Sequence, residues 1–158
     1  MQYKIILEKY GGKEMKLINQ FNEYLANLAV ITFKLHNLHW NEMGRNFVQV
    51  HLYTEEVYDK TFEYLDEVAE QFKMYDATPD SMLKDYLAKA TIKEIEPRKF
   101  TPEEALQILL DDLIILRDQA TELRNACDEE GWFSSVALFE DHVADYNKRI
   151  WFLKATLA

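Results

Sequence analysis

Four side chains that can bind a metal ion recur at helical spacing in one stretch of this chain. His51 and Glu55 are four residues apart, and so are Asp66 and Glu70. At about 100° per residue, the four positions fall within a stripe roughly 100° wide on a helix, so they face the same way. Imidazole and carboxylate groups suit iron, zinc and manganese. The pattern therefore indicates a metal site on one helix face.

The two pairs cannot hold one metal ion within one chain. Glu55 and Asp66 are eleven residues apart, or roughly 16 Å along a helix, whereas ligand atoms lie about 2 Å from a metal. If two copies of the helix pack antiparallel about a two-fold axis, Asp66 and Glu70 of one copy approach His51 and Glu55 of the other. Such an interface carries two identical sites. We therefore expect an intersubunit metal site.

Two further histidines precede this stripe. His39 lies twelve residues before His51, and a tight turn at Gly44 would bring the two side chains together. His36, three residues before His39, could orient it or bind metal transiently. Trp40 could absorb stray oxidising equivalents beside such a centre. Structural roles without metal binding stay open for these residues, because a single histidine at a helix end more often packs against neighbours or caps the helix. Each pair of the stripe, taken alone, also matches a solvated helix surface.

The composition predicts one globular, mainly helical domain. A chain of 158 residues can bury a substantial core, and 48% hydrophobic with 29% charged residues is typical of soluble proteins. The 4 glycines and 3 prolines leave little material for turns, which favours long helices. The single cysteine, Cys127, fits a reducing cytosol, and the N-terminal apolar run is too short for a signal peptide or membrane span. A net charge of −10 repels nucleic acid and attracts cations.

Apolar residues at helical spacing predict an all-α bundle. The expected core positions, in the order of the four long helices, are Leu17, Phe21, Leu25, Leu28, Ile31, Leu35 and Leu38; Phe47, Val50, Val57, Leu65, Val68 and Phe72; Leu106, Leu109, Leu113, Leu116, Ala120 and Leu123; and Phe139, Val143, Tyr146, Ile150 and Trp151. The four long helices are expected at about residues 13–41, 45–75, 101–128 and 132–156, after an N-terminal tail of residues 1–12. Thr101-Pro102-Glu103-Glu104 forms a capping box at one helix start, and Gly44 and Gly131 can end helices. Thr78-Pro79 predicts a short helix that runs through about residue 88.

The lengths of the connections predict the order of the helices in space. Short turns at residues 42–44 and 129–131 make antiparallel hairpins, whereas about 26 residues separate the second and third long helices. One long crossover of this kind gives a ferritin-like four-helix bundle with a short helix in the crossover, over residues 13–158. The usual single-chain di-iron bundle is disfavoured, because no Glu-x-x-His motif occurs and His142 has the wrong spacing.

At these residues the chain resembles the Dps family, the twelve-subunit bacterial mini-ferritins. The resemblance covers residues 13–158. The matching segments are His39-Trp40-Asn41, Gly44, Phe47, His51, residues 65–70 and residues 148–155. It implies a ferroxidase centre at a two-fold interface. On this chain the catalytic and metal-binding residues would be His39, His51 and Glu55 of one subunit with Asp66 and Glu70 of its neighbour. Glu55 stands where the family usually has Asp.

The resemblance also implies a function. Members of the family form cytoplasmic dodecamers that oxidise Fe(II), preferably with hydrogen peroxide. They store the ferric mineral and so protect the cell from oxidative damage. Zinc or manganese could take the same ligands.

Two other hypotheses stay open. The first is a DNA-binding protein that protects the nucleoid. Residues 1–16 hold four lysines against two glutamates, which is a weak basic excess on a strongly acidic chain. We therefore do not expect DNA binding as the main activity. The second is a structural bundle whose histidines and carboxylates have no role in metal binding. We expect no membrane association.

Overall fold

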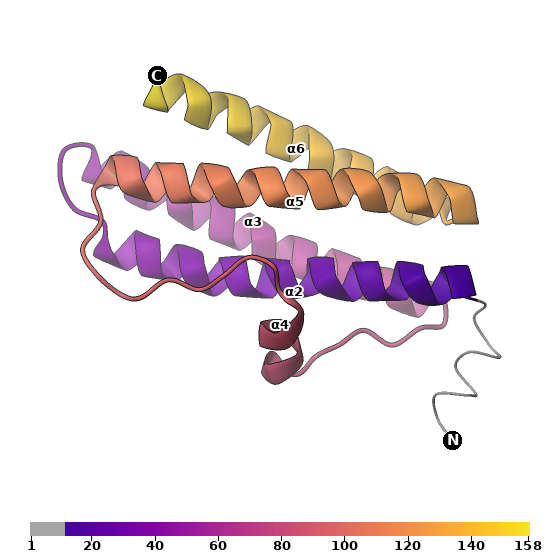
Figure 1. Cartoon of the computed structure of the whole chain (residues 1–158). Coiled ribbons are helices and arrows are strands. Elements are labelled where there is room, and N and C mark those ends of the chain that lie inside the picture. Colours follow the sequence, from indigo (N-terminus) through magenta and orange to yellow (C-terminus); the bar gives the residue numbers. More distant parts are fainter. Residues whose placement is uncertain (1–11) are drawn as a thin grey trace.

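The structure is a computed structural model that describes residues 12–158, with side chains from residue 16. Figure 1 shows the long helices side by side and a short helix in the connection that runs along the bundle. The described residues form α2 (Gly12–Asn41), α3 (Phe47–Met74), α4 (Leu83–Lys89), α5 (Pro102–Glu130) and α6 (Phe133–Leu157). This confirms the predicted all-α bundle with a short helix in a long crossover. The predicted tail lies outside the described residues, except that Gly12 begins α2.

Two tight turns make the hairpins α2–α3 and α5–α6. In the first turn, Gly44 and Asn46 have φ angles of 137° and 69°. Because Asn46 is left-handed and forms the N-cap, α3 begins at Phe47, slightly later than predicted. In the second turn, Gly131 is left-handed and ends α5 after Glu130. Its N–H donates to the carbonyl of Asp128, a helix ending that favours glycine.

The short helix α4 begins later than predicted. Thr78-Pro79 does not start it, because residues 78–82 are irregular and the N-cap is Met82. The backbone N–H of Asp80 donates to Asn22 Oδ1 on α2 at 3.0 Å. The Tyr86 hydroxyl donates to the carbonyl of Asp80 at 2.7 Å. These hydrogen bonds hold residues 78–82 against α2 in an irregular conformation. Tertiary contacts thus outweigh the local preference of Thr78-Pro79 for a helix start.

Asparagines on α2 attach the rest of the crossover. Asn27 Oδ1 accepts from the backbone N–H groups of Thr91 and Ile92, at 2.9 Å each. The Asn37 amide donates to the carbonyl of Ile95 at 2.9 Å. The crossover ends where Phe100 pairs with the turn after α2: its carbonyl accepts from Met43 N–H at 2.9 Å. This pairing braces the α2–α3 turn that carries the candidate site.

Most of the predicted core positions are buried. All seven on α2 and all six on α5 are buried, which confirms the helical periodicity. Two expectations are wrong. Phe47 is 38% exposed, because it is the first residue of α3 and lies at the end of the bundle. Trp151 is 65% exposed, because it lies on the outer side of α6, where it packs against Phe152.

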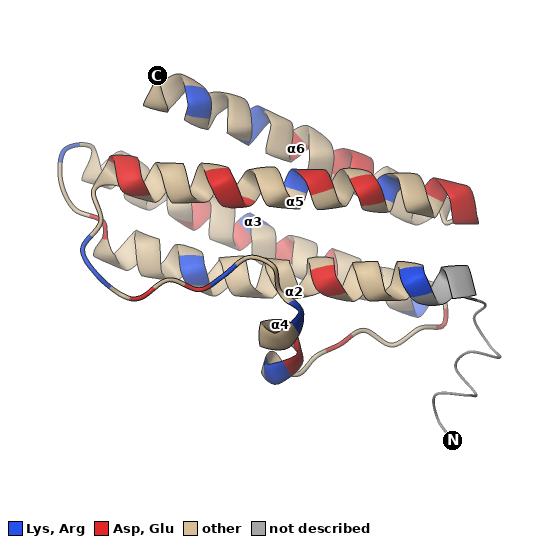
Figure 2. Cartoon of the chain, viewed as in Figure 1, with Lys and Arg blue, Asp and Glu red and all other residues tan. Residues whose placement is uncertain are grey.

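Charged residues of both signs occur along the bundle (Figure 2). Acidic residues recur along α5, and basic residues are interspersed on each long helix. Among the described residues, no helix is long and apolar enough to cross a membrane. The described helices pack around one apolar core.

Candidate metal centre

The α2–α3 turn brings His39 and His51 into contact. His39 is in the last turn of α2 and His51 is in the second turn of α3. Their rings are stacked, with centroids 3.5 Å apart and planes inclined by 21°. The turn at Gly44 led us to expect this proximity. The two imidazoles thus form one unit at the end of the bundle.

Each ring of this pair is held by the other residue's backbone. His39 Nδ1 donates to the carbonyl of His51 at 2.8 Å, and His51 Nδ1 donates to the carbonyl of His39 at 2.9 Å. A carbonyl can only accept, so each Nδ1 carries a proton. The lone pair that each ring can offer to a metal is therefore on Nε2. Metal-binding histidines are usually fixed in this way.

Burial favours the neutral form of the His39 imidazole. The side chain is 6% exposed, and burial lowers the pKa of its imidazolium below the usual value. The hydrogen bond to His51 and the nearby Glu55 act in the opposite direction, but burial has the larger effect. His39 is therefore neutral near pH 7 and can donate its Nε2 lone pair to a cation.

His36 does not bond to His39. Its Nδ1 donates to the carbonyl of Thr32 at 2.7 Å, and its ring is stacked on Tyr58 with centroids 3.9 Å apart. Tyr58 in turn contacts His39 edge-on, with centroids 5.3 Å apart. Trp40 is 68% exposed and lies 5.4 Å from His36 between ring centroids. His36 thus packs behind the pair and reaches His39 only through Tyr58.

The three candidate carboxylates do not complete a site within one chain. Glu55 is half-buried one turn after His51, whereas Asp66 and Glu70 are exposed further along α3. None of the three makes a hydrogen bond or ion pair with another described side chain. Among the described residues, no three His, Cys, Asp or Glu side chains come close enough to hold a metal ion. The structure joins His39 to His51 and leaves Asp66 and Glu70 apart, as the spacing requires.

An exposed apolar residue lies in the middle of the stripe. Phe62 is seven residues after Glu55 and four before Asp66, so it shares their helix face. Its side chain is 64% exposed. In an antiparallel pair that matches Glu55 with Asp66 of a second copy, the two-fold axis passes close to Phe62. Large exposed apolar side chains in such a place favour an interface.

One buried carboxylate at this end of the bundle escaped the sequence analysis. Glu42, in the turn after α2, is 2% exposed, and neither carboxylate oxygen has a hydrogen-bond partner among the described residues. Burial raises the pKa of Glu42, while the nearby His51 partly lowers it. Its position in a polar turn gave no sign of burial. The side chain turns inward because Asn41 and Met43 pair with Phe100 on either side of it.

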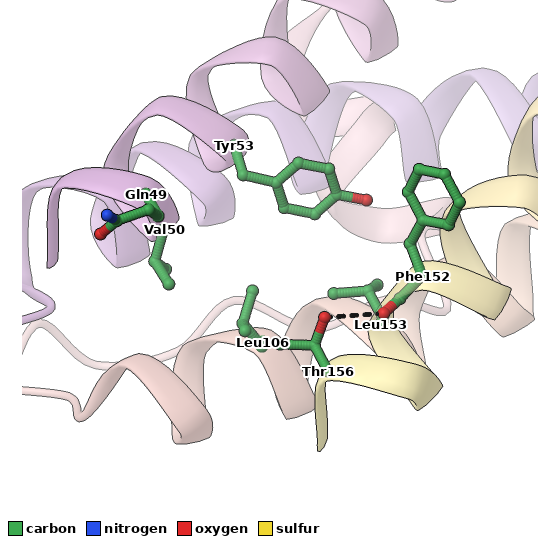
Figure 3. Close-up of a pocket in the computed structure, with 7 residues that line it drawn as sticks. All are labelled: Gln49, Val50, Tyr53, Leu106, Phe152, Leu153 and Thr156. Carbon is green, nitrogen blue, oxygen red and sulfur yellow. Dashed lines mark hydrogen bonds between the residues drawn. The ribbon is translucent and has the colours of Figure 1, made fainter. Parts of the chain in front are cut away.

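An apolar groove lies at the same end of the bundle, between α3, α5 and α6 (Figure 3). Its volume is about 220 Å³, and it is lined by Gln49, Val50, Tyr53, Leu106, Phe152, Leu153 and Thr156. None of these is an imidazole, thiol or carboxylate, so the groove lacks the ligands of a metal centre. The histidine pair is the better candidate.

Known proteins similar to this chain match most of its length. The family model of the ferritin-like domain (Ferritin) matches residues 18–158. A DNA protection during starvation protein from Helicobacter pylori is 31% identical over 144 residues, covering 91% of this chain and 100% of the relative.

Solved structures are similarly close. The crystal structure of antigen TpF1 from Treponema pallidum has a TM-score of 0.88 and 30% identity, covering 90% of this chain and 92% of that one. A Dps protein from Vibrio cholerae O1, described as a member of a broad superfamily of ferritin-like diiron-carboxylate proteins, has a TM-score of 0.87 and 31% identity. That match covers 92% of this chain and 91% of the other. The similarity extends over nearly the whole length of each protein.

Proposed function

Because this chain belongs to the Dps family of ferritin-like proteins, we propose that it stores and detoxifies iron as a ferroxidase. It oxidises Fe(II), preferably with hydrogen peroxide, and keeps the ferric product as mineral inside an oligomeric shell of twelve subunits. Its place of action is the cytoplasm. The single observation that carries the proposal is the histidine pair, whose two Nδ1 atoms are engaged so that both Nε2 atoms are free.

The proposed centre is shared by two subunits. His39, His51 and Glu55 of one subunit bind Fe(II) together with Asp66 and Glu70 of its neighbour. The imidazoles supply Nε2 lone pairs, and the carboxylates supply the negative charge that offsets a divalent cation. The spacing along α3, the exposure of Asp66 and the exposed Phe62 between the two halves support this arrangement.

The ligand types suit the chemistry of iron oxidation. Two Fe(II) ions release two electrons, which with two protons reduce one hydrogen peroxide to two water molecules. Iron and peroxide are then removed together, which suppresses the one-electron side reaction that forms hydroxyl radical. Carboxylate oxygens bind the harder Fe(III) product well. Zinc and manganese fit the same ligands and would compete with iron.

Glu55 gives this chain its own variant of the centre. Its carboxylate extends one methylene further from the helix than the Asp that is usual in the family. The charge is unchanged, so we expect Glu55→Asp to keep iron oxidation while altering the affinity for Fe(II). Titration of Fe(II) under anaerobic conditions measures that difference.

The decisive experiment loads the purified protein with Fe(II) without oxygen and then adds a pulse of peroxide. Ultraviolet absorbance follows Fe(III) formation, and particle mass is measured in parallel. We expect fast oxidation with a soluble product, slowed at least about tenfold in His51→Ala and in Asp66→Ala, since even outer-shell changes have effects of this size. Glu63→Ala is the matched control, because Glu63 lies on α3 in an exposed pair with Lys60. Unchanged rates in both site variants would reject the assignment.

A DNA-protecting role is the second candidate, because relatives of this chain are named DNA protection during starvation proteins. The net charge of −10 opposes it, since phosphate contacts need Lys and Arg. Gel shifts at low salt test it directly. We expect no change in the mobility of DNA at an ionic strength near 0.15 M. A salt-sensitive change there would favour DNA protection over iron storage as the main function.

A further inference from the structure

A cluster of buried polar rings lies in the bundle core and has no part in the proposed iron centre. It consists of Tyr24 on α2, Tyr64 on α3, and His142 and Tyr146 on α6. Each of these side chains is at most 4% exposed. Apolar side chains fill such positions in most bundles. Three tyrosines and a histidine in contact at this depth therefore require an explanation.

The cluster forms one directed chain of hydrogen bonds. His142 Nε2 lies 3.2 Å from Glu67 Oε2, and its Nδ1 lies 3.1 Å from the Tyr24 hydroxyl. Among the described residues, the Tyr146 hydroxyl has no acceptor other than the Tyr24 oxygen, 2.7 Å away, so it donates its proton there. The Tyr24 hydroxyl then donates to His142 Nδ1, which therefore carries a lone pair, and the ring proton is on Nε2, facing Glu67.

Burial fixes the protonation state of the cluster. It lowers the pKa of His142 to about 3, so the ring is neutral near pH 7. It also raises the pKa of Tyr24, so the phenol keeps its proton. Tyr24 is thus a neutral phenol whose proton points at an unprotonated nitrogen. This is the arrangement in which a phenol most readily loses an electron and a proton together.

From this geometry we propose that Tyr24 is a redox-active tyrosine and that His142 is its proton acceptor. One electron leaves the Tyr24 phenol for a strong one-electron oxidant, such as hydroxyl radical. The hydroxyl proton moves to His142 Nδ1. The products are a neutral phenoxyl radical, which keeps its hydrogen bond from Tyr146, and an imidazolium paired with Glu67. Burial does not prevent the transfer, because an oxidised phenol is a far stronger acid than imidazolium.

Aromatic contacts connect the cluster to the rest of the protein. The Tyr64 ring is stacked on His142 with centroids 3.7 Å apart, and Tyr64 lies on α3, the helix that carries the proposed iron ligands. On the other side, Tyr24 contacts Phe139, which contacts Phe21, at 5.6 and 5.2 Å between centroids. The role as a sink rests on the proposed function, since iron and peroxide are the source of the oxidant. The redox property of Tyr24 does not.

The test generates the radical without iron. The whole protein is oxidised with radiolytically produced azidyl radical, frozen, and examined by electron paramagnetic resonance. We expect a phenoxyl signal that is lost in Tyr24→Phe and weakened in His142→Gln, which retains the phenol but lacks the basic nitrogen. Tyr86→Phe is the matched control, because its hydroxyl bonds only to a backbone carbonyl in the crossover. Thermal unfolding confirms that each variant is folded.

The outcomes separate this inference from the proposed function. If the phenoxyl signal is the same in Tyr24→Phe, Tyr86→Phe and the unaltered protein, Tyr24 is not the redox-active residue and the cluster is only structural. If the signal depends on Tyr24 but the protein does not oxidise Fe(II), the redox property stands and the iron function fails. With iron and peroxide, Tyr24→Phe should oxidise Fe(II) normally yet accumulate more oxidative damage elsewhere in the chain.

Discussion

At the scale of single residues, His39 and His51 fix each other. Each ring donates to the other's carbonyl, so rotating one ring breaks a hydrogen bond and disturbs the stack. The tautomer of both rings is therefore set before any metal arrives. A preorganised pair loses less conformational freedom on binding than two mobile side chains, which raises affinity.

Glu42 is a residue whose burial opposes folding when it is charged. We expect Glu42→Gln to raise stability at pH 8 by about 1 kcal/mol or more, because an unpartnered charge costs more to bury than an amide in the same place. Burial raises the pKa of Glu42, so the folded state keeps this proton while the unfolded state releases it. The contribution of Glu42 to the free energy of unfolding therefore falls as the pH rises above the pKa that this carboxyl group has in the unfolded chain. Thermal unfolding from pH 5 to 8 should show a steeper loss for the unaltered protein. Parallel curves would contradict the prediction, and exposed Glu63→Gln is the control.

His142 predicts a loss of stability in acid. Its pKa is about 3 in the folded protein, against 6.5 for an unperturbed imidazole. Between these values only the unfolded state binds the proton, so stability falls with decreasing pH by at most about 1.4 kcal/mol per unit for this group. The His142→Gln variant lacks this proton uptake, and its denaturant midpoint should depend less on pH between 6 and 4. Equal slopes for the two proteins would show that His142 is accessible to protons in the folded state.

At the scale of helices, the start of α5 is set by side-chain capping. Thr101 Oγ1 accepts from Glu104 N–H at 3.1 Å, and Glu104 Oε2 accepts from Thr101 N–H at 2.8 Å. The cap follows directly on Phe100, which pairs with the α2–α3 turn. The capping box therefore positions both the start of α5 and the end of the crossover at Phe100, which braces the α2–α3 turn.

Removing the cap tests its contribution. We expect Thr101→Ala to lower the free energy of unfolding by about 1 kcal/mol, because the Glu104 N–H loses its acceptor. Thr101→Ser keeps the hydroxyl and should stay close to the unaltered protein. Urea unfolding gives the energies, and amide hydrogen exchange at residues 102–104 shows whether the helix start frays. Equal stability of the two variants would mean that the cap contributes nothing measurable.

At the scale of the whole molecule, the proposed centre requires two chains. Both halves are present on every subunit, but Asp66 and Glu70 lie too far along α3 from His51 to meet it within one chain. A two-fold pair gives two identical centres. Each centre then takes its histidines from one subunit and its distal carboxylates from the other.

This geometry predicts complementation between two inactive variants. In a pair made of one His51→Ala subunit and one Asp66→Ala subunit, one centre lacks both residues and the other has neither change. Mixed assemblies obtained by co-expression should therefore recover part of the iron oxidation that each variant alone has lost. A mixture of two His51→Ala preparations carrying different tags is the control. No recovery in verified mixed assemblies would place the centre within a single chain.

The sequence by itself determined the helices and the spacing of the candidate ligands. The apolar periodicity located the core faces of α2 and α5, and the capping box and Gly131 marked the two ends of α5 within two residues. These features are local, because they depend on residues within about one to three turns of one another. The separation of Glu55 and Asp66 along α3 likewise follows from helix geometry alone, so the sequence already indicated that a second chain completes the proposed site.

Only the tertiary structure decided what happens between segments distant in sequence. The hydrogen bond from the Asp80 N–H to Asn22 Oδ1 keeps residues 78–82 out of α4, and the pairing of Phe100 with the α2–α3 turn buries Glu42. The chain of contacts from Tyr24 to His142 joins residues 118 positions apart. No local pattern shows such contacts, because they form only after the helices pack and the buried polar groups must find partners. The helical bundle could therefore be predicted from the sequence, whereas its buried polar contacts could not.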